Sequence, residues 1–260
     1  MHAVASARLA RSALALLSAF AVLLVFASAL PAKGAKPPKT RGGAQGIFTE
    51  TLLSNERDTS RWAFVGRRTS AWSEPGQRGI KLRKLTTRTP DKTSELVLAL
   101  RERVYDDGTI WTEVRLPMRG SDARGWVARS ALEKYRVIHT RIEIDRTALT
   151  LTLLKYEKPI FNAAIGVGNS KASTPAGSFY VRNRFESVNP KGRFGPFALG
   201  LSAQVAGGSD WPGGRTIGIH GTNRPGRIPG RGKERSVRMR NGDVRKLFSL
   251  TPPGTPVSIR

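Results

Sequence analysis

The stretch IGIHGTN at residues 217–223, followed by RSVRMRNGDVRKLF at residues 235–248, decides the fold of this chain. The first stretch is an apolar strand pattern that ends in His220, and a Gly-Thr-Asn turn follows it. The second predicts a short helix over residues 241–250, because Asn241 is a good N-cap and an acid lies in the first turn. This order predicts a β-rich domain that presents a histidine at a strand end.

His220 is the candidate for a chemical role, because the other two histidines are placed less favourably. His2 lies in the leader, and we interpret His139 as a surface or hydrogen-bonded core residue. Where a strand runs out into a glycine turn, an imidazole ring can be half-buried and can exchange protons with a pocket. A purely structural histidine is the competing interpretation, and spacing alone leaves both open.

Strand and turn patterns extend from this region towards both ends of the chain. The 27 glycines and 16 prolines indicate many turns, and the absence of a long helical periodicity favours a mainly β fold. Residues 95–105 and 109–116 flank Asp107-Gly108, which predicts a β-hairpin. A second hairpin is predicted over residues 149–168, with its turn near Tyr156–Lys158. Further strands are predicted at 141–146, 177–185, 197–203 and 256–260.

The first 32 residues have the pattern of a targeting segment. Two arginines precede an apolar run at residues 12–30, and an Ala-Ser-Ala sequence offers a cleavage site. Residues 1–32 are therefore predicted to be a signal peptide, or an uncleaved N-terminal anchor, since about 20 apolar residues can span a bilayer. Both alternatives place the rest of the chain outside the cytoplasm, in the cell wall or periplasm, secreted or membrane-anchored. Residues 33–60 are predicted to be a flexible linker.

The chain is strongly basic and has no cysteine. Its formal net charge is +25. For an exported protein, such a charge favours anionic wall polymers, acidic lipid headgroups or carboxylate-rich peptides as partners, and no nucleic acid is expected. A solvated surface is the competing explanation for much of this charge. The absence of cysteine excludes disulfides and a thiolate nucleophile, and with three histidines in all we expect neither a metal site nor a cofactor.

Four short blocks between residues 137 and 260 resemble, in this order, the L,D-transpeptidase family, which cross-links peptidoglycan stem peptides. Family members typically read Thr-Pro-x-Gly-x-Phe, a Gly-rich Ala-Leu segment, Ile-His-Gly-Thr and Ser-His-Gly-Cys-x-Arg-Met-x-Asn. The matching blocks here are STPAGSFYV at 173–181, GPFALGLS at 195–202, IGIHGTN at 217–223 and RSVRMRNGDVRKLF at 235–248. The resemblance implies a β-sandwich with a short helix over residues 137–260.

A weaker resemblance covers residues 61–135. This segment is similar to the bacterial Src-homology-3-like domains of wall proteins, whose last strand commonly carries Gly-Trp-Val, here Gly125-Trp126-Val127. It implies a smaller β-barrel ahead of the larger domain. We interpret its tryptophans as core residues rather than as a platform for sugars or peptides. They are Trp62, Trp72, Trp111 and Trp126.

The stronger resemblance assigns roles residue by residue. In the family, a cysteine thiolate attacks the stem-peptide carbonyl, and a histidine that is oriented by a backbone carbonyl takes its proton. These roles map onto Ser236 as the nucleophile position, His220 as proton acceptor and donor, and the carbonyl of Gly221. The family's arginine maps onto Arg238, which can bind a substrate carboxylate through two parallel hydrogen bonds. The substrate-binding residues that the resemblance implies are Arg238, Thr222 and Asn241.

The sequence departs from the family where the reaction takes place. The family's Ser-His-Gly-Cys falls on Lys233-Glu234-Arg235-Ser236, so all four positions differ. Serine is far less acidic than cysteine and acts as a nucleophile only with an aligned base and a strong oxyanion hole. Arg235 stands where glycine makes the tight turn that aims backbone N–H groups. Loss of the ordinary family reaction is the simplest interpretation.

Three hypotheses about function remain open on the sequence. In the first, Ser236 performs acyl transfer on peptidoglycan stem peptides with His220 as base. In the second, the protein is a non-catalytic relative that binds stem peptides or regulates a true transpeptidase. In the third, the basic loop of residues 224–246, with nine basic residues and two acids, binds anionic wall polymer or nucleic acid. The third is weakened for nucleic acid, because no aromatic residues interleave the basic ones as single-strand binding requires.

Overall fold

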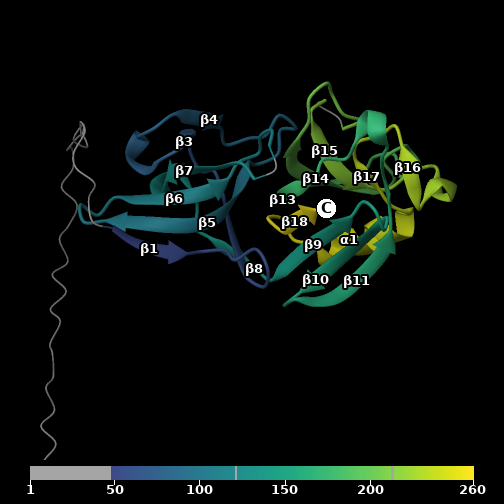
Figure 1. Ribbon diagram of the computed structural model, residues 1–260, viewed down its shortest axis with the longest axis horizontal. Coiled ribbons are helices and arrows are strands. Elements are labelled where there is room, and N and C mark those ends of the chain that lie inside the picture. The colour runs from purple at the N-terminus through teal and green to yellow at the C-terminus, as the bar shows by residue number, and fades with distance from the viewer. Residues whose placement is uncertain (1–47, 121, 212–213) are drawn as a thin grey trace, which may run out of the picture. The chain divides into compact units, whose positions relative to one another are not determined.

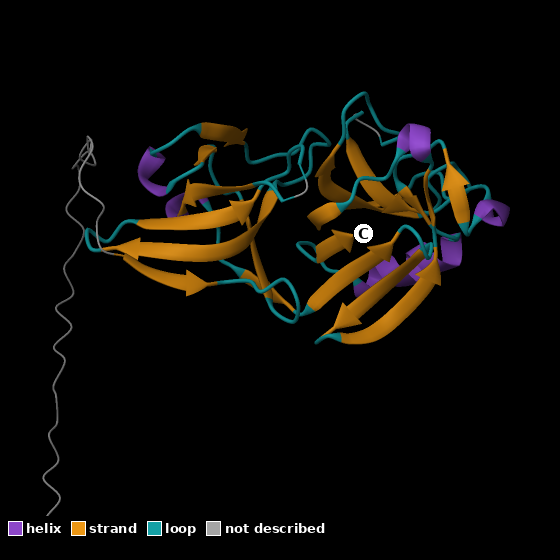
Figure 2. Ribbon diagram, viewed as in Figure 1, coloured by secondary structure: helices purple, strands orange, loops and turns teal. Residues whose placement is uncertain are grey.

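The computed structural model describes residues 48–120, 122–211 and 214–260. The predicted signal segment or anchor over residues 1–32, and the start of the predicted linker, lie outside these residues. The described chain is mainly β, with one α-helix, α1 (Asn241–Leu250), and four short 3-10 helices (Figures 1 and 2). No described helix is both long and apolar enough to span a membrane. The 3-10 helices are η1 (Pro75–Gln77), η2 (Arg129–Ala131), η3 (Ser170–Ala172) and η4 (Pro225–Arg227).

The N-terminal part of the described chain forms one sheet. Seven of its strands follow the order β4-β3-β7-β6-β5-β2-β8, and β1 pairs with β5. Small apolar clusters, with Val97, Val114 and Val127 fully buried, fill its inner face. Its strands are β1 (Phe48–Leu52), β2 (Ser60–Phe64), β3 (Thr69–Trp72), β4 (Lys81–Leu85), β5 (Leu96–Tyr105), β6 (Ile110–Arg115), β7 (Arg124–Ala128) and β8 (Arg136–Ile138).

The C-terminal part forms a second, longer sheet in the order β11-β10-β9-β18-β13-β14-β15-β17-β12-β16. Strand β18, from the chain's C-terminal end, lies inside this sheet, parallel to β9 and antiparallel to β13. Its strands are β9 (Thr140–Asp145), β10 (Thr150–Lys155), β11 (Lys158–Ala164), β12 (Gly166–Gly168), β13 (Gly177–Glu186), β14 (Phe197–Gln204), β15 (Thr216–His220), β16 (Gly230–Gly232), β17 (Val237–Arg238) and β18 (Pro256–Ile259).

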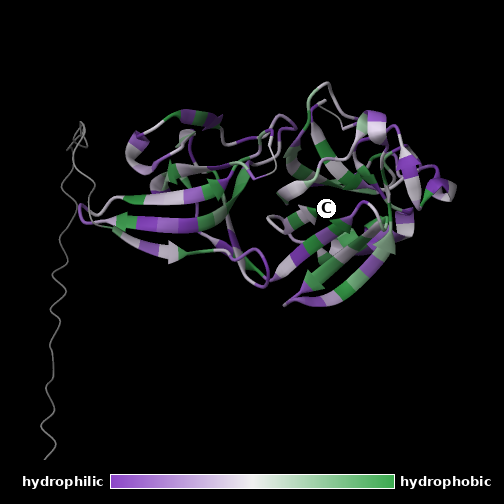
Figure 3. Ribbon diagram, in the orientation of Figure 1, coloured by the Kyte–Doolittle hydropathy of each residue, from purple (hydrophilic) through white to green (hydrophobic). Residues whose placement is uncertain are grey.

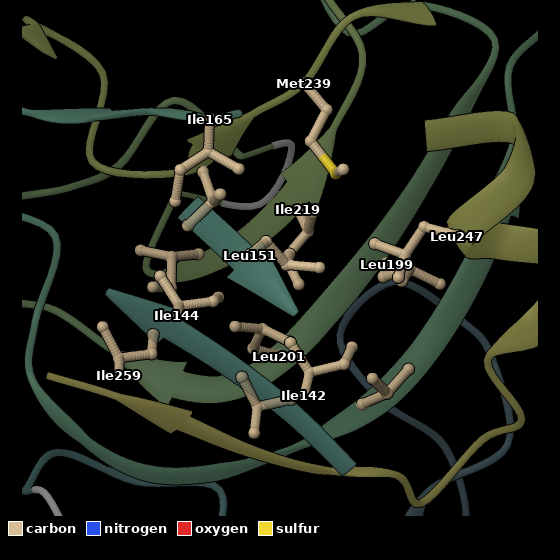
Figure 4. Packing of buried hydrophobic residues seen from close by; sticks show 14 of the residues in the cluster. Ile142, Ile144, Leu151, Ile165, Leu199, Leu201, Ile219, Met239, Leu247 and Ile259 are labelled. Atoms are coloured by element: carbon tan, nitrogen blue, oxygen red, sulfur yellow. The ribbon is translucent and has the colours of Figure 1, made fainter. Parts of the chain in front are cut away.

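The second sheet curls around one apolar core, which Figure 4 shows from close by. Ile142 on β9 and Leu151 on β10 belong to the same cluster as Leu199 on β14 and Ile219 on β15, although these strands lie far apart in the sheet order. Leu247 adds the buried face of α1. Since burying one such side chain stabilises a protein by about 1.5–3 kcal/mol, this cluster is the main reason that the sheet curls.

Alternation of apolar and polar residues explains why these segments are strands. The TRIEID sequence of β9 has the burial pattern buried, half-buried, buried, half-buried, and the alternating bands are visible along the strands in Figure 3. The predicted hairpin turns are present: Gly108 has φ +77° between β5 and β6, and Tyr156 and Glu157 have positive φ between β10 and β11. The expectation of a mainly β fold is confirmed.

Two predicted boundaries need correction. The linker predicted over residues 33–60 contains strand β1, which pairs with β5 from Phe48↔Tyr105 to Leu52↔Arg101. Strand β8 pairs with β2 of the first sheet, so residues 137 and 138 belong to that sheet rather than to the domain predicted from residue 137. Both strands are short and lie at positions where exposed residues hide the alternation. The resemblance of the first sheet to Src-homology-3-like domains stays a prediction.

The tryptophans of the first sheet divide into two groups. Trp62 and Trp126 are 5% and 6% exposed and lie in the core, whereas Trp72 and Trp111 are half-buried. Trp72 and Trp126 face each other across β3 and β7. The four therefore do not form a single exposed platform of the kind that binds sugars.

Candidate functional site

His220 is the last residue of β15 and lies between two neighbouring strands. Ala198 of β14 pairs with it on one side, and Arg238 of β17 pairs with it in parallel on the other. All residues of the TIGIH strand after Thr216 are buried, and Phe194 packs edge-on against the imidazole with ring centroids 5.0 Å apart. The ring is thus 2% exposed and held on several sides.

Both ring nitrogens of His220 face oxygen atoms. Nδ1 lies 2.7 Å from the carbonyl oxygen of Gly221, which is the orienting contact that the resemblance implies. Nε2 lies 3.2 Å from Oδ2 of Asp210, a residue in the loop between β14 and β15. The Asp210 side chain is 6% exposed. In this arrangement, a carboxylate occupies the side of the histidine that a base needs for its substrate.

Asp210 also contacts the backbone of Ser236. Its second oxygen, Oδ1, accepts a hydrogen bond of 3.2 Å from the Ser236 amide. Burial raises the pKa of the Asp210 carboxyl, but the hydrogen bond and charge of His220, together with the Ser236 amide, outweigh burial and lower this pKa to about 2. Asp210 is therefore a carboxylate at neutral pH and bridges the histidine and the backbone of the serine.

The bridge occupies both ring nitrogens of His220. A carbonyl oxygen and an ionised carboxylate are both acceptors only, and one of them faces each nitrogen. While Asp210 holds this position, neither nitrogen is free to take a proton from Ser236, and in this arrangement His220 cannot serve as the general base.

Ser236 directly precedes β17 and is fully buried. Its Oγ accepts a hydrogen bond of 3.2 Å from the amide of Gly218, and within the described residues no hydrogen bond joins this hydroxyl to His220. The preceding residue, Arg235, is fixed through its carbonyl oxygen, to which Thr174 Oγ1 donates at 2.7 Å. The chain around Ser236 is therefore held by backbone contacts that leave the hydroxyl inside the protein.

Thr222 and Asn241 form hydrogen bonds that fix the turn after His220. Asn241 Oδ1 accepts a hydrogen bond of 2.8 Å from the amide of Thr222, and Thr222 Oγ1 in turn accepts one from the amide of Arg224. The prediction that Asn241 caps α1 is wrong, because Arg240 is the N-cap and the Asn241 side chain is used by the turn. Asn241 thus joins α1 to the segment that follows β15.

Arg238 is buried beside β12 and β16. Its Nη2 donates to the carbonyl of Val167 at 3.0 Å, and its Nη1 lies 3.4 Å from Oε2 of Glu234. A Cβ atom on Gly166 or Gly232 would lie 2.8 Å from a guanidinium nitrogen, so glycine at both positions makes room for this side chain. Arg238 therefore braces three strands, and part of its donor set is already used.

A pocket of about 320 Å³ lies beside these residues. His220, Thr222 and Arg238 line it, so the structure brings three of the predicted site residues together at one cavity. Ser236 and Asn241 are absent from the described residues that line it. The lining residues are Arg193, His220, Thr222, Asn223, Arg224, Arg227, Glu234 and Arg238.

Asp210 was not predicted as a site residue. It lies in the glycine-rich loop AGGSDWPGG at residues 206–214, where no periodicity or motif marks it. The usable signal is indirect: Gly218 occurs in a strand interior, and the ring of Trp211 fills the space where its side chain would lie. Gly200, on the neighbouring strand, is covered by both Asn183 and Trp211. Packing of Trp211 against these glycines fixes the position of the preceding residue, Asp210.

Replacing Asp210 with asparagine is expected to lower the free energy of unfolding by about 2 kcal/mol at pH 7. The pKa of Asp210 falls from an ordinary 3.8 to about 2 on folding, so its contribution is complete above pH 4 and is lost as the pH falls through 2. Denaturant unfolding of both proteins between pH 7 and pH 3 measures this difference. Glu74→Gln, at an exposed acid, is the control, and equal effects of the two changes would show that the bridge contributes nothing.

Comparison with known proteins identifies relatives of the C-terminal part. Residues 139–259 match the YkuD family, described as the L,D-transpeptidase catalytic domain. The Bacillus subtilis protein YkuD, which carries the name of an L,D-transpeptidase, is 38% identical over 118 residues, which are 45% of this chain and 64% of that protein. The protein of the same name from Bacillus licheniformis is 37% identical over 119 residues, 46% of this chain and 64% of its own. The chain spans just under two thirds of the length of these relatives.

A solved structure shows a more distant likeness. The crystal structure of a cysteine-to-serine mutant of the Enterococcus faecium L,D-transpeptidase is 26% identical. The match covers 46% of this chain and 49% of that chain, with a TM-score of 0.37.

Proposed function

Residues 139–259 belong to the L,D-transpeptidase catalytic-domain family, and from this premise we propose that the protein binds peptidoglycan stem peptides without performing the family's acyl transfer. The family membership supports a role at peptidoglycan. The loss of the reaction is our inference from the site, and binding without turnover is the function that remains to such a domain.

The observation that carries this proposal is the position of Asp210. Its carboxylate bridges Nε2 of His220 and the amide of Ser236 at 3.2 Å each. An acyl transfer through serine needs a free histidine nitrogen within reach of the hydroxyl. Here that nitrogen donates to a carboxylate, and the backbone N–H of Ser236, which would otherwise be free to bind an oxyanion, is occupied by the same carboxylate.

The environment of the Ser236 hydroxyl supports the same conclusion. The side chain is fully buried, and its oxygen accepts from the amide of Gly218. A serine hydroxyl is already far less nucleophilic than a thiolate, so it depends on access and on a base more than a cysteine does. The proposal includes the location: the ligand lies outside the cytoplasm, and the apolar segment at residues 12–30 favours export to the cell wall or periplasm.

The purified protein is expected to form no covalent adduct with a carbapenem or with an activated tetrapeptide donor, ligands of the kind that the family accepts. Intact-mass measurement after incubation checks this. The physical reason is that neither the base nor the nucleophile is available while Asp210 bridges them. A family member that retains its cysteine serves as the positive control for each reagent, and Ser236→Ala serves as the matched negative control.

The competing hypothesis, in which Ser236 is the nucleophile, has a distinct outcome. It requires a mass increase in the wild-type protein that disappears in Ser236→Ala. Binding is measured separately, by sedimentation of the protein with purified peptidoglycan. An adduct of that kind would overturn the non-catalytic proposal, and failure to sediment with peptidoglycan would overturn the binding role.

A further inference from the structure

The pocket beside His220 is surrounded by arginines. Arg193 approaches from the segment before β14, Arg224 and Arg227 lie at the two ends of the turn that contains η4, and Arg238 comes from β17. Glu234 is the one acid that lines the pocket. The four guanidiniums and the single carboxylate leave a net positive charge at the pocket.

Most of this charge has no ion-pair partner among the described residues. Arg193, Arg224 and Arg227 form none there, and Glu234 is engaged with Arg238 at 3.4 Å. Arg193 instead lies over the ring of Phe194, 4.9 Å from its centroid. The three unpaired arginines are exposed, and cations gathered at one cavity create a positive potential that attracts anions. The pocket therefore presents an uncompensated positive charge to a negatively charged ligand.

Arg238 contributes a largely buried positive charge to the same pocket. Its side chain is 7% exposed and lines the pocket, and its Nη1 lies 3.4 Å from Glu234. Its Nε has no hydrogen-bond partner among the described residues, but this atom is shielded from the pocket. A bound anion would therefore be attracted by the charge of the guanidinium rather than by this donor.

The arginines at the rim are carried by an anchored loop. Arg240 Nη2 donates to the carbonyl of Ile228 at 2.6 Å, and residues 230–232 pair as β16 with β12. The turn itself is closed by a hydrogen bond of 3.1 Å from the Arg227 amide to the carbonyl of Arg224. Fixing the loop before the ligand arrives lowers the entropy lost on binding.

We propose that this pocket binds a multiply charged oxyanion of the phosphate class. This deepens the proposed function by naming a ligand group of the same site, and it rests on that function for its biological setting. A phosphate carries up to two negative charges and presents tetrahedral oxygens to donors that approach from several directions. A single carboxylate is planar and is satisfied by one guanidinium fork, which leaves the remaining arginines unpaired.

Titration calorimetry with inorganic phosphate and inorganic pyrophosphate, at fixed ionic strength, tests the proposal. One molecule of each is expected to bind per protein, pyrophosphate more tightly, while acetate produces no measurable heat of binding. Arg224→Gln/Arg227→Gln is expected to weaken pyrophosphate binding by at least about tenfold, because each charged hydrogen bond contributes a factor of this order.

The matched control removes the same number of positive charges at positions outside the pocket. Arg68→Gln/Arg119→Gln changes two exposed arginines of the first part of the chain, outside the pocket, and should alter pyrophosphate affinity by less than about twofold. Equal weakening in the two double variants would show that only net charge matters and would overturn the site. So would acetate binding as tightly as phosphate, or a protein that binds neither phosphate nor pyrophosphate.

Peptidoglycan sedimentation separates this inference from the proposed function. Peptidoglycan is prepared with its phosphate-bearing polymers attached and after their removal. If the protein binds to both preparations and pyrophosphate does not weaken this binding, the stem-peptide role is kept and the phosphate site is overturned. Pyrophosphate binding without sedimentation of either preparation would keep the site and overturn the proposed function. Tighter, pyrophosphate-sensitive binding to the unstripped preparation would identify the polymer as the source of the phosphate.

Discussion

Replacing Arg182 with methionine is expected to lower the free energy of unfolding by about 3–5 kcal/mol. Arg182 on β13 forms a buried ion pair with Glu95, the residue before β5, and the two are separated by 87 residues in sequence. Nε of Arg182 donates to Oε1 of Glu95 at 2.7 Å, and the side chains are 2% and 3% exposed. Removing one partner leaves the other charge buried without compensation, which is the reason for the large effect.

Glu95 also interacts with a second arginine, Arg83, so losing its charge affects two guanidiniums. Arg83 is half-buried near Arg182, and its Nε is buried without a hydrogen-bond partner among the described residues. Burial lowers the pKa of Arg83, and the charge of Arg182 lowers it further, whereas Glu95 opposes both. Glu95→Gln therefore leaves two guanidiniums facing each other and is expected to be as destabilising as Arg182→Met.

Denaturant unfolding of the single and double variants measures this coupling. Glu95→Gln/Arg182→Met should be less destabilised than the sum of the two single changes. The double variant removes both charges of the pair, so neither Glu95 nor Arg182 is left buried without its partner. Arg57→Met is the control, since the Arg57–Glu157 pair is 71% and 47% exposed and contributes less than about 1 kcal/mol. An effect of Arg182→Met no larger than that of the control would contradict the account.

The parts of the fold that could be predicted from the sequence are those determined by local sequence patterns. The turn at Gly108 requires a positive φ that glycine adopts without strain, so Asp107-Gly108 between alternating segments was sufficient to predict β5 and β6. Helix α1 was predicted over its observed residues, although the cap assigned to Asn241 was wrong. Strand β1 was missed because all five of its residues are exposed and it gains its place by pairing with β5, a contact that no local pattern encodes.

The contacts of the candidate site also divide into those that could be predicted and those that could not. His220 and Gly221 are adjacent in sequence, and the contact between the ring and the Gly221 carbonyl was expected from the family resemblance. The bridge from Asp210 to His220 and Ser236 was not, because it joins residues 10 and 26 positions apart through an irregular loop. The roles of His220 and Ser236 in a reaction stay predictions, and the bridge is what makes us favour binding over turnover.

Trp211→Ala is expected to lower the free energy of unfolding by about 3–5 kcal/mol, the range for deleting a large buried aromatic side chain. Trp211 is 4% exposed and its ring packs against Phe185, with centroids 5.7 Å apart. It also lies on the backbone of β14 and β15 at Gly200 and Gly218. Unfolding of Trp211→Ala beside Trp211→Phe measures the loss, and the phenylalanine variant should retain part of the packing.

Gly218, which lies against the Trp211 ring, provides a direct test of this packing. A Cβ atom on Gly218 would overlap the Trp211 ring, so Gly218→Ala should destabilise the wild-type protein by about 1–3 kcal/mol. In the Trp211→Ala background most of that loss should disappear, and the remainder comes from the carbonyl of Leu199, 2.9 Å from the same position. If the two changes were simply additive, Trp211 would not be seated on Gly218. The position of Asp210 beside His220 would then need another support, because Trp211 is the buried residue that holds this end of the loop.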